Sequence, residues 1–292
     1  MDEAISGLWV ALPTPLDADS HVDHAALVRH ALWLLEQRCD GLVLFGSIGE
    51  GPSFTAAERL SATEALLKAG IPTGRIALGT GCTAIADTVA LTRQAMALGL
   101  VHILILPPWY FRDVSQDGVA DAFAAIIDGV GSIRLRALLY DVPAMSGIAI
   151  DPPTLGRLRA RYGSVVAGVH DCSRNFVAFR QAAPDCSILV GTEADIASAR
   201  AAGAVGAISA MANLVPAVVR AMFEEPAADS AMQAAADAFE GHAFLPMLKA
   251  VLAATSGDAA WRAVRPPLRP AHPAHGARIA ASLAALQAPR AA

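Results

Sequence analysis

The chain has 292 residues, of which 54% are hydrophobic and only 5% aromatic, and its formal net charge is −5. This charge, without a basic cluster, argues against a nucleic-acid-binding protein, and no apolar run reaches the roughly 18–20 residues that a membrane-spanning helix needs. The N-terminus lacks the basic and apolar segments of a signal peptide, and the four cysteines have no Cys-x-x-Cys spacing. A cytoplasmic protein with reduced thiols is therefore expected.

Taken in order, the chain alternates short apolar runs with segments of helical periodicity. The runs of strand length are Leu8–Pro13, Gly41–Gly46, Arg75–Thr80, His102–Pro107, Leu135–Val142, Val165–His170, Cys186–Gly191 and Gly206–Ala210. The helical segments are His24–Gln37, Thr55–Ala69, Ala84–Leu98, Gln116–Asp128, Pro153–Tyr162, Asn175–Ala183, Asp195–Ala202 and Pro216–Glu224. Because the apolar runs are continuous rather than alternating, both faces of each strand are expected to be buried, as in a parallel sheet. Eight such units predict an α/β protein with a (β/α)8 TIM barrel, whereas a doubly wound sheet would more often show five or six strands.

The pattern changes near residue 225, where strand-like runs stop. The remaining sequence is helical over Ser230–Thr255 and Ala274–Leu286, and a proline-rich stretch at 265–270 separates these segments. We therefore predict a barrel over residues 1–225 and a C-terminal helical extension over residues 226–292.

Polar residues close most of the apolar runs. In a (β/α)8 barrel the active site lies at the C-terminal ends of the strands, so these residues are the candidates for its chemistry. They are Thr14, Gly46-Ser47-Ile48-Gly49-Glu50, Thr80, Trp109-Tyr110, Tyr140-Asp141, His170-Asp171, Thr192-Glu193 and Ser209, with Gly191 at the end of the seventh run. The convergence of tyrosines, hydroxyls, one histidine and carboxylates at one rim predicts a pocket.

Two of these stretches carry specific chemistry. In the loop Gly46–Gly49, flanking glycines allow backbone N–H groups to point inward and Ser47 adds a hydroxyl, which suits a small carboxylate or a developing oxyanion. The alternative is a tight turn that needs glycine for its conformation alone. Tyr140 closes the fifth run, where a phenol can relay a proton or hold a carbonyl oxygen, or simply bond to the backbone at the rim.

These residues together resemble the dihydrodipicolinate synthase / N-acetylneuraminate lyase family, which consists of class I aldolases on a (β/α)8 barrel with a C-terminal helical extension. The resemblance extends over nearly the whole chain. It rests on Pro13-Thr14-Pro15, Gly46-Ser47-Ile48-Gly49-Glu50, Pro108-Trp109-Tyr110, Tyr140-Asp141-Val142-Pro143, Gly168-Val169-His170-Asp171, Gly206-Ala207-Ile208-Ser209 with Asn213, and Lys249 ahead of Arg265-Pro266-Pro267.

The resemblance implies roles for several residues. Ser47 and the backbone at Ile48 would hold the carboxylate of a 2-oxo acid, and Tyr140 would be the proton-relaying phenol. Tyr110 looks like the tyrosine that family members lend to a neighbouring subunit, which implies a homodimer or a homotetramer. We expect Tyr140, His170 and Tyr110 to be catalytic, and the substrate-binding residues are expected to be Ser47, Ile48, Thr14, Gly191, Glu193 and Ser209.

The chain also departs from the family pattern. At the position of the lysine that forms a Schiff base with pyruvate, this sequence has His170, and imidazole cannot form a stable imine with a ketone. The second hydroxyl expected after Ser47 is replaced by Ile48, and a carboxylate-binding arginine is replaced by Met145. The polar run after the seventh strand also differs, at Thr192-Glu193-Ala194. Lysine biosynthesis and sialic-acid cleavage are therefore not the expected activities.

Three classes of function remain open. The first is a lyase that acts on a small 2-oxo acid, such as pyruvate or a sugar-derived one, without a Schiff base or a cofactor; His170 would be the general base, Tyr140 the acid, and Ser47 would help to stabilise an enolate. The second is a metal-assisted lyase or hydratase in which His170 and Asp171 or Glu193 hold a divalent ion, although no compact ligand motif is present. The third is a barrel that has lost catalysis and serves as a ligand-binding or partner protein. The prediction we carry forward is the first class, with no resident metal.

Overall fold

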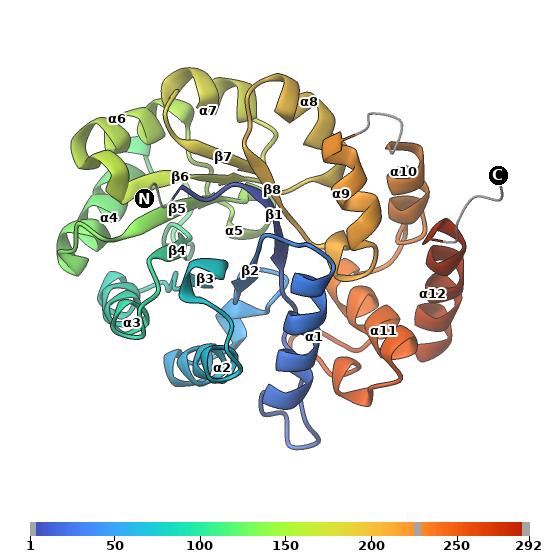
Figure 1. The fold of residues 1–292 in the computed structure, drawn as a ribbon. Helices are drawn as coiled ribbons and strands as arrows, with labels where there is room; N and C mark the ends of the chain where they lie inside the picture. The colour runs from blue at the N-terminus through green and yellow to red at the C-terminus, as the bar shows by residue number, and fades with distance from the viewer. Residues whose placement is uncertain (1–3, 225–228, 288–292) are drawn as a thin grey trace.

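In the computed structural model, which describes residues 4–224 and 229–287, eight parallel strands close into a barrel (Figure 1). The strands are β1 (Gly7–Ala11), β2 (Gly41–Leu44), β3 (Ile76–Gly79), β4 (His102–Ile105), β5 (Arg136–Asp141), β6 (Val166–Asp171), β7 (Ser187–Val190) and β8 (Gly206–Ser209). They pair in chain order, and β8 pairs with β1 to complete the ring. The predicted (β/α)8 barrel is confirmed, and every predicted strand overlaps an observed one.

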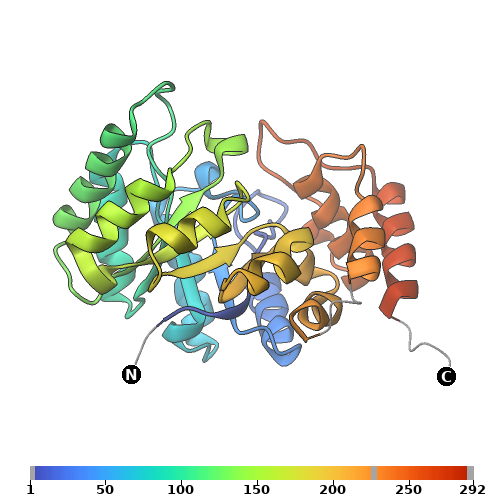
Figure 2. The same cartoon turned by 90° about the horizontal axis from the view of Figure 1, so that it is seen from above.

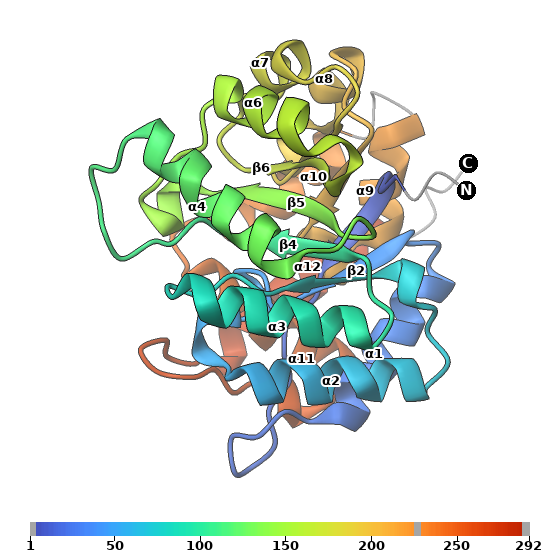
Figure 3. The ribbon, with the colours of Figure 1, turned by 90° about the vertical axis from the view of Figure 1, so that its left-hand side faces the viewer.

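Helices connect successive strands and cover the outside of the barrel (Figures 1 and 3). They are α1 (His24–Glu36), α2 (Ala56–Lys68), α3 (Ile85–Ala97), α4 (Gln116–Val130), α5 (Pro143–Ser146), α6 (Pro152–Tyr162), α7 (Phe176–Ala182), α8 (Ile196–Ala201) and α9 (Pro216–Glu224). Each strand therefore packs against helices on its outer side, and this explains why the strand sequences are apolar on both faces. No helix within the described ranges is long and apolar enough to cross a membrane.

Side chains that alternate along the strands form two separate layers. Trp9, Val43, Leu104 and Leu138 belong to a cluster with members from seven of the eight strands, and this cluster fills the barrel interior. The intervening side chains join a larger cluster between the barrel and its helices. Tyr140 belongs to the inner cluster, so the strand alternation directs its ring into the barrel.

Beyond the barrel, residues 229–287 form three α-helices that lie to one side of it (Figure 2). They are α10 (Asp229–Asp237), α11 (Phe244–Ser256) and α12 (Pro273–Gln287). The sequence predicted one helical stretch over Ser230–Thr255, but the structure interrupts it between α10 and α11. Gly241 adopts a positive φ of 75° there, a left-handed conformation that a continuing helix does not allow.

A buried ion pair ties α11 to the barrel. Lys249 Nζ lies 2.7 Å from Glu50 Oε1 and donates a second hydrogen bond to the Thr14 carbonyl oxygen, and both charged side chains are fully buried. The other carboxylate oxygen of Glu50 accepts from the Arg265 backbone N–H. Because burial favours the neutral amine, it lowers the pKa of Lys249, while the Glu50 carboxylate opposes this shift. These hydrogen bonds satisfy both charged groups, although neither side chain is exposed to solvent.

Candidate functional site

A cavity of about 220 Å³ opens at the C-terminal ends of the strands. Its polar groups come from the loop after β2, the ends of β5 and β6, and the segment after β7; they belong to Ser47, Tyr140, His170, Cys172 and Glu193. Apolar side chains supply most of the remaining wall, among them Met145 and Phe244, the first residue of α11. The helical extension thus contributes directly to the cavity.

Tyr140 and His170 form the centre of the site. The two residues pair in register on β5 and β6, and their rings stack with centroids 4.7 Å apart and an interplanar angle of 17°. Tyr140 Oη lies 3.0 Å from Ser47 Oγ, so the loop after β2 is joined to β5 by a hydroxyl pair. Burial raises the pKa of Tyr140 above its usual range, and the phenol therefore stays protonated at neutral pH.

The hydrogen bonds of His170 indicate its tautomer. Nδ1 lies 3.4 Å from the Leu189 carbonyl oxygen, which can only accept, so the proton belongs on Nδ1. Nε2 then carries the lone pair, and it faces Cys172 Sγ at 3.6 Å. Burial lowers the pKa of His170 to about 4, so the ring is neutral at physiological pH. The neutral ring therefore has one basic nitrogen, Nε2, which accepts the weak hydrogen bond of the Cys172 S–H or, in its place, a proton from a molecule bound in the cavity.

Cys172 is a site residue that the sequence reasoning missed. It lines the cavity and contacts His170, while burial and the Asp171 carboxylate raise the pKa of its thiol to about 12. The thiol is therefore protonated at neutral pH. Strand alternation could have found this residue, because Cys172 follows His170 by two positions and so lies on the same side of the chain.

Gly191 keeps the space beside this group open. A Cβ atom at residue 191 would lie 2.1 Å from Cys172 Sγ and 2.7 Å from His170 Cε1, both far inside van der Waals contact. Glycine is thus required here by close approach of neighbouring side chains rather than by an unusual backbone conformation.

Glu193 is held firmly at the rim. Its Oε1 atom accepts from Ser209 Oγ at 2.6 Å and from two backbone N–H groups, those of Ala210 and Met211, at 3.0 Å each. These bonds fix a carboxylate in the cavity wall. Ser209 itself does not line the cavity, and its hydroxyl is used to orient Glu193.

Some of the predicted site residues line the cavity and others do not. The structure brings Ser47, Ile48, Tyr140, His170, Gly191 and Glu193 together around the cavity. Thr14 is buried outside it and donates a 2.8 Å hydrogen bond to the Gly49 carbonyl oxygen. Tyr110 lies on the loop after β4 with 77% of its surface exposed, stacked edge-to-face on Phe111.

Neither lysine of the chain lines the cavity. Lys68 lies at the end of α2 with a largely exposed side chain and pairs with Glu64. Lys249 is engaged with Glu50. No arginine side chain of the described residues lines the cavity either, so a bound anion would have to be recognised by neutral donors. The Ile48 N–H is such a donor, because no described residue accepts a hydrogen bond from it.

The described part of the chain contains no group of three or more His, Cys, Asp and Glu side chains that could hold a metal ion. His170, Asp171 and Glu193, which the sequence suggested as ligands, do not form such a group. Asp171 points away from His170, because the two residues are adjacent on one strand.

A pair of carboxyl groups lies behind the site. Asp141 and Asp171 pair in register directly after Tyr140 and His170, and both are buried. One oxygen of Asp141 accepts from the Ile150 N–H, and one oxygen of Asp171 accepts from Ser173. The second oxygen of each is buried without a hydrogen bond to any described residue. Burial raises the pKa of both carboxyl groups, because ionisation would place two negative charges in a dry environment.

This pair predicts a pH-dependent effect on stability. A carboxyl group whose pKa is raised by folding stabilises the protein at acidic pH and loses that contribution as the pH rises through its pKa in the folded state. Asp141→Asn cannot ionise and keeps the acceptor for Ile150, so we expect it to raise the melting temperature more at pH 8 than at pH 4. Thermal unfolding at both pH values tests this, with Asp19→Asn on the exposed loop before α1 as the control. An equal effect of Asp141→Asn at the two pH values would contradict it.

Comparisons with known proteins agree on one family. The model of the dihydrodipicolinate synthetase family matches residues 4–272. A protein described as an uncharacterized DapA-like lyase, from Chloroflexus aurantiacus, is 33% identical over 273 residues, which is 90% of each chain. A 4-hydroxy-tetrahydrodipicolinate synthase from Coxiella burnetii is 32% identical over 212 residues, covering 72% of this chain and 71% of the relative.

Solved structures are similar over almost the whole chain. The crystal structure of dihydrodipicolinate synthase from Agrobacterium tumefaciens has a TM-score of 0.90 and 32% identity, and the match covers 97% of this chain and 99% of that one. YagE of Escherichia coli K12, solved in complex with pyruvate, has a TM-score of 0.86 over 97% of this chain and 99% of that one. Because its identity is only 22%, this second likeness concerns the fold alone.

Proposed function

Because the chain belongs to the dihydrodipicolinate synthetase family, we propose that it is a lyase that binds a small 2-oxo acid, such as pyruvate or a sugar-derived 2-oxo acid, and acts on it without a lysine Schiff base. The observation that supports this most directly is the composition of the cavity wall. It contains the Tyr140–His170 pair and no lysine, since Lys249 is held by Glu50 and Lys68 ends a surface helix.

Binding of the acid would use neutral donors at the loop after β2. In this proposal the Ser47 hydroxyl and the Ile48 N–H receive the carboxylate. The carbonyl oxygen would then lie toward Tyr140 Oη, which is 3.0 Å from Ser47 Oγ. Glu193, which follows β7 and is held by Ser209, would exclude a second anionic group and favour a substrate whose far end is neutral or rich in hydroxyls.

The chemistry proposed is proton abstraction next to a carbonyl group. His170 Nε2 would remove a proton from the carbon beside the carbonyl, and the developing enolate oxygen would receive a hydrogen bond or a proton from Tyr140. The lowered pKa of His170 keeps the base neutral, and the raised pKa of Tyr140 keeps the acid protonated. The enolate formed in this way would add to the carbonyl group of a second substrate and form a carbon–carbon bond, or expel a hydroxyl group from the next carbon and break a carbon–oxygen bond. In the reverse of the addition, cleavage of the carbon–carbon bond would release the same enolate, which a proton would then quench.

A binding experiment tests the ligand class. We expect pyruvate at about 100 times its dissociation constant to stabilise the protein by about 2.7 kcal/mol, measured as a thermal shift. Ser47→Ala is expected to lose most of this shift, whereas Ser53→Ala, just beyond the same loop, should keep it. A panel of 2-oxo acids and sugar acids, with and without divalent metals, completes the experiment. A shift that requires metal would favour the metal-assisted lyase, and no shift with any ligand would favour a barrel that has lost catalysis.

Borohydride reduction tests the absence of an imine. With pyruvate present, reduction should leave the mass of the protein unchanged, because no cavity lysine is available. A reduced pyruvyl adduct on Lys68 or Lys249 would overturn this part of the proposal.

A cytoplasmic location and assembly into a homodimer or homotetramer belong to the same proposal. The exposed pair of Tyr110 and Phe111, 77% and 74% accessible, suits a contact with a second copy of the chain. Size-exclusion chromatography with light scattering measures the molar mass in solution. A mass equal to that of one chain would contradict the proposed assembly.

A further inference from the structure

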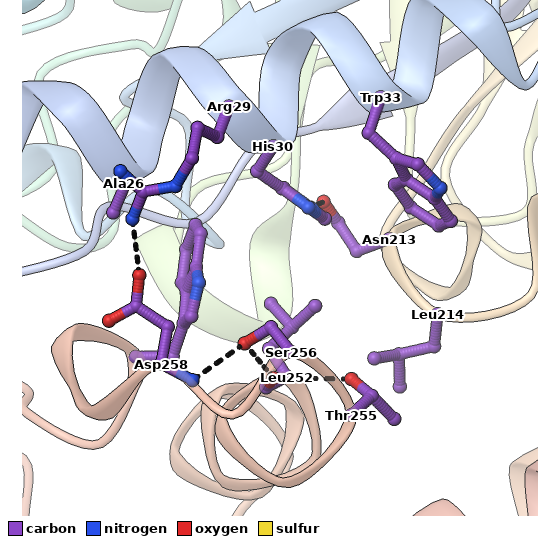
Figure 4. A pocket seen from close by; sticks show the side chains of 11 residues that line it. Ala26, Arg29, His30, Trp33, Asn213, Leu214, Leu252, Thr255, Ser256 and Asp258 are labelled. Carbon is purple, nitrogen blue, oxygen red and sulfur yellow. Dashed lines mark hydrogen bonds and ion pairs between the residues drawn. The ribbon is translucent and has the colours of Figure 1, made fainter.

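A second and larger cavity lies away from the barrel mouth. Its volume is about 420 Å³. It is lined by α1, the segment at Asn213 and Leu214, the end of α11 and the turn that follows (Figure 4). It therefore lies where the barrel and the helical extension meet. A cavity of this size can hold a small organic molecule.

Aromatic rings form its walls. The His30 ring stacks on Trp33 with centroids 5.4 Å apart and an interplanar angle of 21°, and it meets Trp261 edge-to-face at 5.0 Å. Two of the four tryptophans of the chain thus lie at this cavity, on segments far apart in sequence. Flat faces of this kind favour a planar ring that can pack against them.

The hydrogen bonds around His30 show which of its two ring nitrogens can accept a hydrogen bond from a ligand. Asn213 Nδ2 donates to the carbonyl oxygens of Ala11 and Ala210, so its Oδ1 faces His30 Nε2 at 3.0 Å. Nε2 must therefore carry the proton, and Nδ1 is an acceptor on a ring that lines the cavity. No other hydrogen bond joins His30 to a described residue.

The charges at the cavity cancel each other. Arg29 and Asp258 form an ion pair at one end, with 2.5 Å between Arg29 Nη2 and Asp258 Oδ2 (Figure 4). The nearby Thr255 and Ser256 hydroxyls donate to carbonyl oxygens of their own helix. Neither an anion nor a cation is favoured by this balance. The ligand that fits best is neutral, planar and equipped with one N–H donor.

Asn213 also connects this cavity to the candidate active site. The two residues whose carbonyl oxygens it holds, Ala11 and Ala210, both line the cavity at the barrel mouth. The Ala210 N–H in turn donates to Glu193. A ligand that moves or immobilises His30 therefore acts, through one side chain, on the wall of the other cavity.

We propose that the cavity between α1 and α11 is a second ligand site for a neutral, planar heteroaromatic molecule with a ring N–H, and that its occupancy changes binding at the barrel mouth. The coupling part of this proposal rests on the proposed function, whereas the ligand site does not.

Calorimetric titration of the full chain with indole and with 1-methylindole tests the site. These probes share a shape and differ in the N–H donor. Indole should bind the protein, and 1-methylindole should bind about tenfold more weakly. Trp33→Ala should weaken indole binding about tenfold. Leu32→Ala, its exposed neighbour on α1 and no part of the cavity wall, should leave binding unchanged.

A third variant isolates the hydrogen bond. His30→Phe keeps a ring in the wall but removes the acceptor, so it should weaken indole and leave 1-methylindole unaffected. Absence of saturable indole binding, or equal effects of Trp33→Ala and Leu32→Ala, would overturn the site. Equal affinities for the two probes would overturn the assignment of the N–H donor.

The coupling is measured separately. Pyruvate titrated in the presence of saturating indole should show a dissociation constant changed by about fivefold or more, and pyruvate should change indole affinity by the same factor. An unchanged pyruvate affinity would overturn the coupling and leave the ligand site standing. Failure of pyruvate to bind at all would overturn the proposed function instead, and the indole titration would still decide the site.

Discussion

Replacing His170 with alanine is expected to slow the exchange of pyruvate methyl protons with solvent deuterium by about 10²–10⁴-fold, the range that a positioned general base contributes. The exchange reports formation of the enolate, so it requires no knowledge of the second substrate. Proton NMR of pyruvate in deuterated buffer measures it directly. The fold should persist, because the ring is stacked on Tyr140 at the end of a strand and the barrel core below it is unchanged.

The pH profile of the exchange tests whether the buried imidazole of His170 is the base. Because the pKa of His170 is lowered to about 4, the base is available at all pH values above this, and the exchange rate should fall only as the pH drops through about 4. An ordinary exposed histidine would produce that fall near pH 6.5 instead.

A matched histidine provides the control. His21→Ala removes a side chain that is 75% exposed on the loop before α1, and it should leave the exchange rate unchanged. The contrary result would be a His170→Ala variant with the exchange rate and the melting temperature of the unaltered protein. That result would remove His170 from the mechanism and favour a barrel that only binds its ligand.

The largest expected loss of stability follows from Lys249→Met. This change removes one partner of a fully buried ion pair and leaves the Glu50 carboxylate without its cation, a situation that costs about 3–5 kcal/mol. Such a loss is a large part of the roughly 5–15 kcal/mol by which folded proteins are stable. Urea unfolding at neutral pH measures it as a lower midpoint.

The other lysine of the chain is the natural comparison. Lys68→Met breaks an exposed i,i+4 pair with Glu64 and should change the free energy of unfolding by only about 0.3–0.5 kcal/mol. The double change Glu50→Gln with Lys249→Met removes the stranded charge and should recover part of the loss. If Lys249→Met and Lys68→Met unfold at the same urea concentration, the buried pair of Lys249 and Glu50 does not anchor the helical extension.

The position of the candidate site could be predicted from the sequence with few long-range assumptions. Eight continuous apolar runs required burial on both faces, and a parallel barrel places the ends of its strands at one rim. Tyr140 and His170 end adjacent strands, and their proximity therefore followed from the strand order. Gly191 and Glu193 followed from the same rule.

Other features depended on contacts between distant segments, which periodicity does not record. Thr14 also lies shortly after a strand, yet its hydroxyl donates a hydrogen bond to the Gly49 carbonyl oxygen and does not reach the cavity. Tyr110 lies in a loop whose direction no strand fixes. Phe244 enters the cavity from a helix that begins far along the chain.

The sequence by itself determined the barrel, the rim that carries its chemistry, and the presence of only two lysines, because these depend on local pattern and composition. Only the tertiary structure decided that Lys249 is paired with Glu50, that Cys172 faces His170, and that Asn213 links two cavities. Each of these is a side-chain contact whose partner is chosen by three-dimensional packing and by the need of buried polar groups for hydrogen bonds.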